Sequence, residues 1–270
     1  MKKIGIIITT FERTKLLSKC LYKLVEYLED NWRIIIIDQS KESNAKKDVI
    51  NDIRFTIPDL IHYEKAPFNS GLSYCRNFGV EKAKELGCEY VVIGSDSFLF
   101  NESIKRIEEI TKILYSDKID KCGFQLYNCC CGWEAKLNLI EGKYFELDFV
   151  DLNNCSLYRN INEDIIPIWE VDICRNFFVA TTKSLLDVKW NENFKLGEHE
   201  DHCWRYKLAG YKTLWTNFIS ASKMTDRPDE YVKYRKENFK DGLRKLREKY
   251  NISGWVQYKH LSRAKNINHL

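Results

Sequence analysis

A short acidic stretch holds the residues best suited to move a proton. Glu198, His199, Glu200 and Asp201 are consecutive, so three carboxylates and an imidazole fall within four positions. A carboxylate or a neutral imidazole can take the proton of a hydroxyl group while that hydroxyl attacks an electrophile. We predict that Glu200 or Asp201 is such a base and that Glu198 positions it or contacts the attacking molecule. His199 is the open alternative, since the ordinary pKa of histidine is about 6.5.

The same stretch also contains a pair of histidines at helical spacing. His202 follows His199 by three residues, which places both on one face of a helix. Two such side chains could bind zinc, but no distant third ligand stands out, and the ten cysteines contain no C-x-x-C pair. The sequence therefore favours proton transfer over a zinc site.

Polar side chains also follow three apolar runs that have the pattern of buried strands. They are Thr9, Thr10, Phe11 and Arg13 after the first run, Asp38 after the second, and Asp96 after the third. Because the carboxyl ends of parallel strands meet at one edge of a sheet, these side chains should surround a single pocket. Hydroxyls, an aromatic ring, an arginine and acids are groups that can bind a base, a ribose and phosphates.

A further pair of candidate binding residues lies within a helix. Residues 71–86 form an amphipathic pattern that opens at Gly71, and Arg76 and Asn77 stand side by side within it. The amino end of a helix attracts phosphate, and an arginine one turn into the helix adds positive charge. We therefore predict that Arg76 and Asn77 contact a phosphate-bearing ligand.

Strand and helix patterns alternate through the first half of the chain. Apolar runs at residues 4–9, 33–38, 60–64 and 90–93 are separated or followed by helical patterns at 16–28, 71–86 and 104–114. This order predicts an α/β fold with a mostly parallel central sheet and helices on both faces. The second half is less regular, with strand patterns at 121–128 and 171–182, a hairpin pattern at 136–149 turning at Glu141-Gly142, and helical patterns at 200–208 and 231–250.

The composition is that of an ordinary globular protein. The chain has 270 residues, 44% of them hydrophobic and 30% charged, and only four prolines. The apolar run near the start is too short for a signal peptide, and no segment approaches the roughly 20 apolar residues of a membrane span. We therefore predict a cytosolic protein whose cysteines are reduced and serve mostly as packing residues, although the run Cys129–Cys131 has no assigned role.

The motifs, taken in order, resemble glycosyltransferase family 2 and related inverting transferases of the GT-A fold. TTFER, IIDQS, NSGLSYCRNFGV and the strand leading to Ser95-Asp96-Ser97 match the nucleotide half of that family. VDICRNFFVATTKSLL and GEHEDHCWRYKLAGYKTLW resemble the acceptor half, particularly of β-1,4-N-acetylgalactosaminyltransferase-like members. The likeness implies a Rossmann-like GT-A domain at residues 1–228, with the nucleotide half at about 1–128 and the acceptor half at about 129–228. Residues 229–270 would form a basic helical extension.

The resemblance also implies an activity and a set of site residues. The activity is the inverting transfer of a hexosyl or N-acetylhexosaminyl group from a UDP-sugar to a glycan or glycolipid. The donor-binding residues would be Thr9, Thr10, Phe11, Arg13, Asp38, Arg76, Asn77 and Asp96. Asp96 would lie beside the sugar and any Mn²⁺ or Mg²⁺ ion. In the register of the family His199 takes the usual place of the base, which leaves Glu200 or Asp201 as the carboxylate that serves instead.

The sequence departs from the family pattern where a metal ion would bind. Ser97 stands at a position where an aspartate ligand is common, and Ser220 takes the place of a histidine ligand. Asp96 alone is a weak metal site, because Mn²⁺ and Mg²⁺ prefer several hard oxygen ligands. We predict transfer with little or no metal dependence, in which Arg76, Lys223 or the basic tail neutralises the leaving diphosphate.

Two other functions fit parts of the sequence. A non-catalytic protein of the same fold, binding a glycan or a protein partner, would explain the missing metal ligands, but the acids of residues 198–201 argue against it. A nucleotidyltransferase would need a glycine-rich phosphate loop, and the segment Thr9–Arg13 contains no glycine.

The chain ends in a basic segment. Residues 229–270 contain eleven Lys and Arg against five Asp and Glu, a net charge of +6, whereas the preceding residues carry −2. We predict contact with an anionic membrane surface rather than a nucleic acid, with a solvated helix face as the alternative. The contact residues would be Arg235, Lys236, Lys240, Arg244, Lys245 and Arg247. Trp133 and Trp169, in loop-like sequence, are predicted to line the acceptor cleft.

Overall fold

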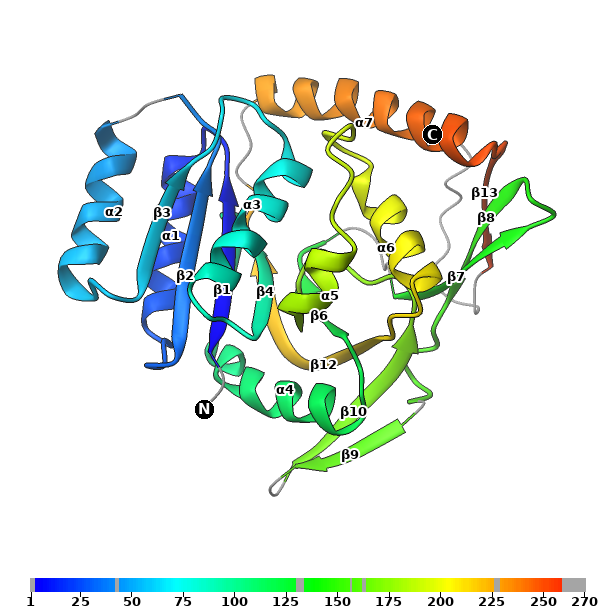
Figure 1. Ribbon diagram of the computed structural model, residues 1–270, viewed down its shortest axis with the longest axis horizontal. Helices are drawn as coiled ribbons and strands as arrows, with labels where there is room; N and C mark the ends of the chain where they lie inside the picture. The colour runs from blue at the N-terminus through cyan, green and yellow to red at the C-terminus, as the bar shows by residue number, and fades with distance from the viewer. Residues whose placement is uncertain are drawn as a thin grey trace.

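The first half of the chain forms a parallel sheet with helices between its strands. The computed structural model describes residues 3–41, 44–129, 134–155, 157–161, 164–225 and 229–258. Four parallel strands lie in the order β3-β2-β1-β4, with bounds β1 (Ile4–Thr10), β2 (Trp32–Asp38), β3 (Ile61–Lys65) and β4 (Tyr90–Ser95) (Figure 1). The connecting helices are α1 (Thr14–Val25), α2 (Asn44–Thr56) and α3 (Leu72–Glu85).

The second half extends the same sheet with strands of mixed direction. Its first elements are β5 (Phe98–Phe100), a 3-10 helix (Glu102–Arg106), α4 (Ile107–Ser116) and β6 (Lys121–Tyr127). Later come β9 (Leu157–Ile161), β10 (Asp164–Val171), β11 (Phe178–Thr181), α5 (Thr182–Asp187), α6 (Glu198–Leu208) and β12 (Thr213–Lys223). β11 is antiparallel to both β4 and β6, whereas β12 is parallel to β6, so the antiparallel pairs gather in this half.

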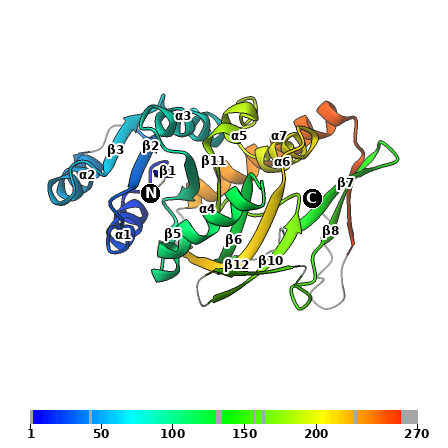
Figure 2. The ribbon, with the colours of Figure 1, turned by 60° about the horizontal axis from the view of Figure 1, so that its bottom comes forward.

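Alternating side chains along the strands build a core on each face of the sheet. Ile4, Ile6 and Ile8 of β1 pack with residues of α1, α2 and α4, whereas Ile7 packs with residues of α3 and α5. Figure 2 shows the two sets of helices on opposite sides of the strands. Because both faces of β1 are covered, all seven of its residues are buried. The predicted fold class, an α/β fold with a largely parallel sheet between two helical layers, is confirmed.

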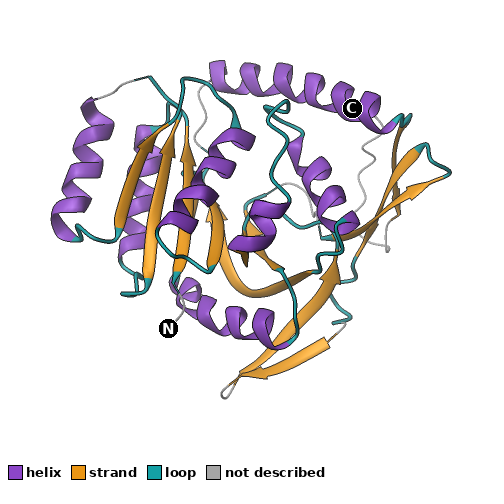
Figure 3. Ribbon diagram, viewed as in Figure 1, coloured by secondary structure: helices purple, strands orange, loops and turns teal. Residues whose placement is uncertain are grey.

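A small second sheet and a long helix complete the fold. β7 (Ala135–Ile140) and β8 (Tyr144–Phe149) form the predicted hairpin, whose turn residues Glu141 and Gly142 have φ angles of 52° and 66°. β13 (Gly254–Tyr258) pairs parallel with β8. α7 (Asp229–Tyr250) lies along the edge of the molecule toward which the arrowheads of β1, β2 and β3 point (Figures 1 and 3).

α7, the helix of the predicted C-terminal extension, packs against β8 and α6. Leu246 of α7 is fully buried in a cluster with Phe145 of β8 and Cys203 of α6. Tyr250, at the end of α7, packs its ring edge to face against Phe145, with the ring centres 5.3 Å apart. α7 therefore has an apolar face, which the many charged residues of the helix make difficult to recognise in the sequence.

Two expectations need correction. The strand predicted at 171–182 is the end of β10 and the whole of β11 with a loop between them, where the Arg175 Nη1 donates to the carbonyl of Leu126 at 3.0 Å. The polar side chains of this loop need hydrogen-bond partners, which the covered faces of a central strand do not offer. The chain therefore leaves the sheet here. Trp169 lies in the core and not in a cleft, because it is 3% exposed and its Nε1 donates to the carbonyls of Asp151 and Asn154. Trp133, Cys130 and Cys131 lie outside the described residues.

The described cysteines behave as packing residues, as predicted. All eight are free thiols, and six of them are buried. None of the helices in the described part of the chain combines the length and the apolar character that a membrane span requires.

Candidate active site

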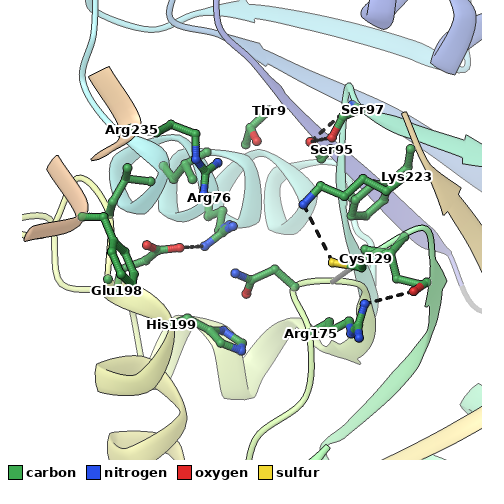
Figure 4. A pocket seen from close by; sticks show the side chains of 18 of the residues that line it. Thr9, Arg76, Ser95, Ser97, Cys129, Arg175, Glu198, His199, Lys223 and Arg235 are labelled. Carbon is green, nitrogen blue, oxygen red and sulfur yellow. Dashed lines mark hydrogen bonds and ion pairs between the residues drawn. The ribbon is translucent and has the colours of Figure 1, made fainter. Parts of the chain in front are cut away.

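A cavity of about 250 Å³ opens at the edge of the sheet where β1 and β4 end. Its walls come from β1, α3, the turn after β4, the loop between β10 and β11, the start of α6, the end of β12, and α7 (Figure 4). Six predicted site residues line it, namely Thr9, Arg13, Arg76, Glu198, His199 and Glu200. The other six do not, namely Thr10, Phe11, Asp38, Asn77, Asp96 and Asp201.

The turn after β4 presents hydroxyls to the cavity. Ser95 and Ser97 line it, with their Oγ atoms 3.0 Å apart. Asp96, between them, is fully buried and turns to the protein interior, where it accepts a hydrogen bond from Thr10 Oγ1 at 2.8 Å and pairs with Arg13. The one acid of the turn therefore faces away from the cavity.

The pair of Arg13 and Asp96 fixes a guanidinium at the cavity wall. Burial raises the pKa of Asp96, and the charge of Arg13 with the hydroxyl of Thr10 opposes that rise. Arg13 Nε donates to the carboxylate at 3.2 Å while the same side chain lines the cavity. Asp96 therefore positions a cation and does not itself reach the ligand space.

Asp38 is likewise saturated by the protein. Its carboxylate accepts hydrogen bonds from the Ser40 amide at 2.9 Å, the Tyr63 hydroxyl at 2.8 Å and Lys46 Nζ at 3.0 Å. Burial alone would raise the pKa of Asp38, but the hydrogen bonds from Ser40 and Tyr63 and the charge of Lys46 lower it to about 2. Asp38 thus ties the end of β2 to β3 and α2, and a contact with a base or ribose stays a prediction.

Phe11 and Asn77 also make contacts within the protein. The ring of Phe11 lies 5.8 Å from that of Phe68. The Asn77 amide donates to the carbonyl of Trp190 at 2.9 Å and accepts from the Trp190 amide at 2.9 Å, which holds α3 against the segment before α6. A direct contact of either residue with a nucleotide remains a prediction.

α6 brings the acidic cluster to the cavity. Gly197, with a φ of 76°, occupies the left-handed region that glycine favours and opens the helix. Glu198 accepts a hydrogen bond from Arg76 Nη1 at 2.5 Å, and both side chains are almost fully buried. Figure 4 shows this pair on one side of the cavity. The charge of Arg76 is therefore partly balanced before any ligand binds.

Glu200 and His199 line the cavity with opposite shifts of pKa. Burial, with smaller contributions from the charges of Glu198 and Asp201, raises the pKa of Glu200 to about 8. Burial and the charges of Arg76 and Lys121 lower the pKa of His199 to about 3. His199 is thus neutral at pH 7 but a weak proton acceptor, so Glu200 is the stronger base of the two.

Asp201 and His202 face other parts of the protein. Asp201 accepts hydrogen bonds from Arg205 Nε at 2.9 Å and the Tyr250 hydroxyl at 2.8 Å, and pairs with Lys249 of α7. The His202 ring stacks on Trp190 with the ring centres 4.2 Å apart. Asp201 therefore joins α6 to α7. Across the described ranges no three His, Cys, Asp or Glu side chains gather as metal ligands, so a zinc site has no support there.

Cations from three further segments line the cavity. Lys223, predicted to neutralise a leaving phosphate, lies at the end of β12. Arg175, which sequence reasoning missed, stands in the loop after β10 and pairs with Glu134 at 3.2 Å. Arg235, assigned to a membrane contact, reaches in from α7 (Figure 4). No local signal distinguishes Arg175 or Arg235 from other basic residues, because only the tertiary fold brings them here.

The side chains around the turn do not fit a divalent cation. Mn²⁺ and Mg²⁺ prefer carboxylates and other hard oxygen ligands, whereas Ser95 and Ser97 offer neutral hydroxyls and Asp96 is already bonded to Thr10 and Arg13. The Ser220 hydroxyl accepts from Asn101 Nδ2 at 2.9 Å. The cationic side chains of the cavity are therefore the groups that can supply the positive charge that a metal ion would otherwise provide.

Comparison with known proteins agrees with this architecture. Residues 5–111 match the sequence model described as glycosyl transferase family 2. No curated protein sequence gives a match. Three solved structures share the fold: S. aureus TarS 1-349 in complex with UDP-GlcNAc (12% identity, TM-score 0.61), GalNAc-T7 with UDP, GalNAc and Mn²⁺ (14%, 0.66), and the mannosyltransferase PcManGT from Pyrobaculum calidifontis in complex with GDP-Man and Mn²⁺ (13%, 0.57).

These alignments cover 84%, 93% and 86% of this chain and 59%, 55% and 59% of the three structures. The chain thus spans less than two thirds of the length of each. At this identity the likeness shows the fold alone. The fold is that of the GT-A glycosyltransferases. Within that class, residues 5–111 match family 2.

Proposed function

We propose that the protein transfers a hexosyl or N-acetylhexosaminyl group from a UDP-sugar to a hydroxyl of a glycan or glycolipid, with inversion at the anomeric carbon. The observation that carries the proposal is the lining of a single cavity. Arg13, Arg76, Lys223 and Arg175 supply positive charge for a diphosphate, and Glu200 supplies a carboxylate for proton transfer. The family 2 match over the nucleotide half supports the choice of a nucleotide sugar as donor.

The transfer follows from the groups that face the cavity. Glu200, in its ionised form, takes the proton of the acceptor hydroxyl as that oxygen attacks the anomeric carbon from the side opposite the diphosphate. The bond between the anomeric carbon and the phosphate oxygen breaks, and the diphosphate leaves with the electron pair. Arginine and lysine side chains stabilise the negative charge that develops on the leaving oxygen. The products are UDP, the inverted glycoside and protonated Glu200.

The same lining supports transfer without a divalent cation. The hydroxyls of Ser95 and Ser97 occupy the cavity side of the turn, and Lys223 lines the same cavity. A fixed cation can replace a metal ion in neutralising a diphosphate, since the stabilisation is electrostatic.

The direct test is to incubate the purified protein with UDP-sugars and GDP-mannose and to measure release of the nucleoside diphosphate. We expect slow donor hydrolysis without acceptor and faster release when a suitable glycan is added. A protein that binds none of these donors at millimolar concentration would contradict the proposal. A protein that binds a donor but never turns it over would instead favour the non-catalytic alternative.

Contact with an anionic membrane remains a proposal for the exposed part of α7. Lys236 and Lys240 are exposed, whereas Lys245 donates to the carbonyl of Asn193 at 3.0 Å and Arg235 enters the cavity. The double change Lys236→Glu and Lys240→Glu should therefore weaken co-sedimentation with phosphatidylserine vesicles, by about 2 kcal/mol in total. Equal binding of the variant and the wild type would exclude this contact.

A further inference from the structure

α7 brings two side chains into the cavity, although it lies more than a hundred residues beyond the nucleotide half. Arg235 and Phe239 both line the cavity, and their spacing of four places them on one face of the helix. Figure 4 shows Arg235 entering on the same side as Arg76. α7 is thus a wall of the site.

Two glycines allow α7 to approach this closely. A methyl group added at Gly242 would overlap the carbonyl oxygen of Leu196, the residue before the glycine that opens α6. A side chain at Gly197 would in turn lie 3.2 Å from the backbone of Gly242. The two backbones therefore touch, one turn of α7 beyond Phe239, and this contact sets how far Arg235 reaches into the cavity.

The docked face continues to the end of the helix. Arg235, Phe239, Gly242, Leu246 and Tyr250 follow one another at intervals of three or four, which keeps them on one stripe. Leu246 is fully buried. Lys249 and Tyr250 bind Asp201, the neighbour of Glu200, so α7 is anchored to the helix that carries the proposed base.

We propose that Arg235 is a donor-binding residue that contacts the diphosphate of the nucleotide sugar, and that α7 is docked to hold it there. This inference rests on the proposed function. Arg76 on the same side is already paired with Glu198 at 2.5 Å, so its charge is partly balanced, and Arg235 adds a second cation at this wall. A guanidinium suits the role because its planar fork can donate two parallel hydrogen bonds to phosphate oxygens.

The test compares the affinity of Arg235→Gln for UDP and for uridine by calorimetry. Loss of a charge-assisted hydrogen bond should weaken UDP binding about tenfold to a hundredfold and leave uridine binding unchanged, because uridine has no phosphate. Arg235→Lys should recover part of the loss. Arg244→Gln is the matched control, since Arg244 lies on the same helix and is exposed and paired with Asp241 and Glu248; it should bind UDP like the wild type.

Wild-type affinity of Arg235→Gln for UDP would overturn this inference while leaving the proposed function intact. An equal loss of uridine binding, in a variant that keeps the melting temperature of the wild type, would also overturn it, because Arg235 would then act on the nucleoside and not on the diphosphate. Failure of the wild type to bind any uridine nucleotide would overturn the proposed function itself, and this inference with it. Gly242→Ala adds a second measurement: the displaced helix should weaken UDP binding and lower the melting temperature together.

Discussion

The acids at the ends of the parallel strands and the acid at the start of α6 have opposite surroundings. Asp38 and Asp96 are each bonded to a cation and to hydroxyls of the protein. Glu200 lies in a buried position beside other acids, which raises its pKa to about 8. The first two carboxylates are used to build the site, whereas the third keeps a titratable proton. The difference teaches that the number of acids at a sheet edge is a poor guide to which of them reacts.

The largest effect on the transfer rate is expected for a change of Glu200, the proposed base. Glu200→Gln keeps the shape of the side chain but cannot accept a proton, so the transfer rate should fall about 10²- to 10⁴-fold. The affinity for UDP should stay the same. Glu170→Gln, at an exposed surface pair on β10, is the matched control and should leave the rate unchanged. A Glu200→Gln enzyme with the wild-type rate would move the role of base to His199.

The structural role of the other acids predicts a loss of stability. Asp96→Asn removes the charge that pairs with Arg13, whose side chain is only 11% exposed, and should lower the free energy of unfolding by about 3 kcal/mol. Asp241→Asn breaks an exposed pair on α7 and should have a much smaller effect, because solvent screens that pair. Urea denaturation measures both. Equal losses of unfolding free energy in the two variants would contradict the structural role assigned to Asp96.

The pH dependence of the rate sharpens the same comparison. If Glu200 must be ionised, kcat/KM should rise about tenfold per pH unit below its pKa and become constant above about pH 8. The pKa of Asp38, about 2, predicts no contribution from that residue in this range. A rate that is flat from pH 6 to pH 9 would contradict the assignment of Glu200.

The free energy of unfolding should fall with pH over the range in which the transfer rate rises, because both depend on the proton of Glu200. The pKa of Glu200 is raised from 4.5 to about 8, so between these values the folded state keeps a proton that the unfolded state has lost. The contribution of protonated Glu200 to stability is therefore complete below pH 4.5 and declines as the pH rises to about 8. The free energy of unfolding of Glu200→Gln should therefore rise relative to that of the wild type over this range, by at most about 1.4 kcal/mol per pH unit. A difference in unfolding free energy that is independent of pH would contradict this.

The smallest expected effect concerns the metal. Because Ser95 and Ser97 offer only hydroxyls to the cavity, EDTA should change the initial rate less than about twofold. Addition of Mn²⁺ after EDTA should give no recovery beyond that. A rate that collapses with EDTA and returns with Mn²⁺ would show that a cation binds at the turn after all.

Much of the first half could be predicted from the sequence, since β1, β2 and β4 are continuous apolar runs and the polar residues follow their ends. The sequence predicts that Arg76, Glu198 and Glu200 belong to one site, and all three line the cavity, while their roles stay predictions. The direction of Asp96 could not be predicted, because it depends on which face of a short turn meets Arg13. Arg175 and Arg235 were missed as site residues because contacts with distant segments bring them to the cavity.

The backbone contact between Gly242 and Leu196 also affects how the molecule is made. During synthesis the chain emerges from its amino end, so α7 is made after α6 and after the last strand of the main sheet. The cavity stays without one wall until the ribosome has released residue 250, the tyrosine that bonds to Asp201. On the proposed function, a nascent chain would therefore lack the contact of Arg235 with the donor until α7 has docked.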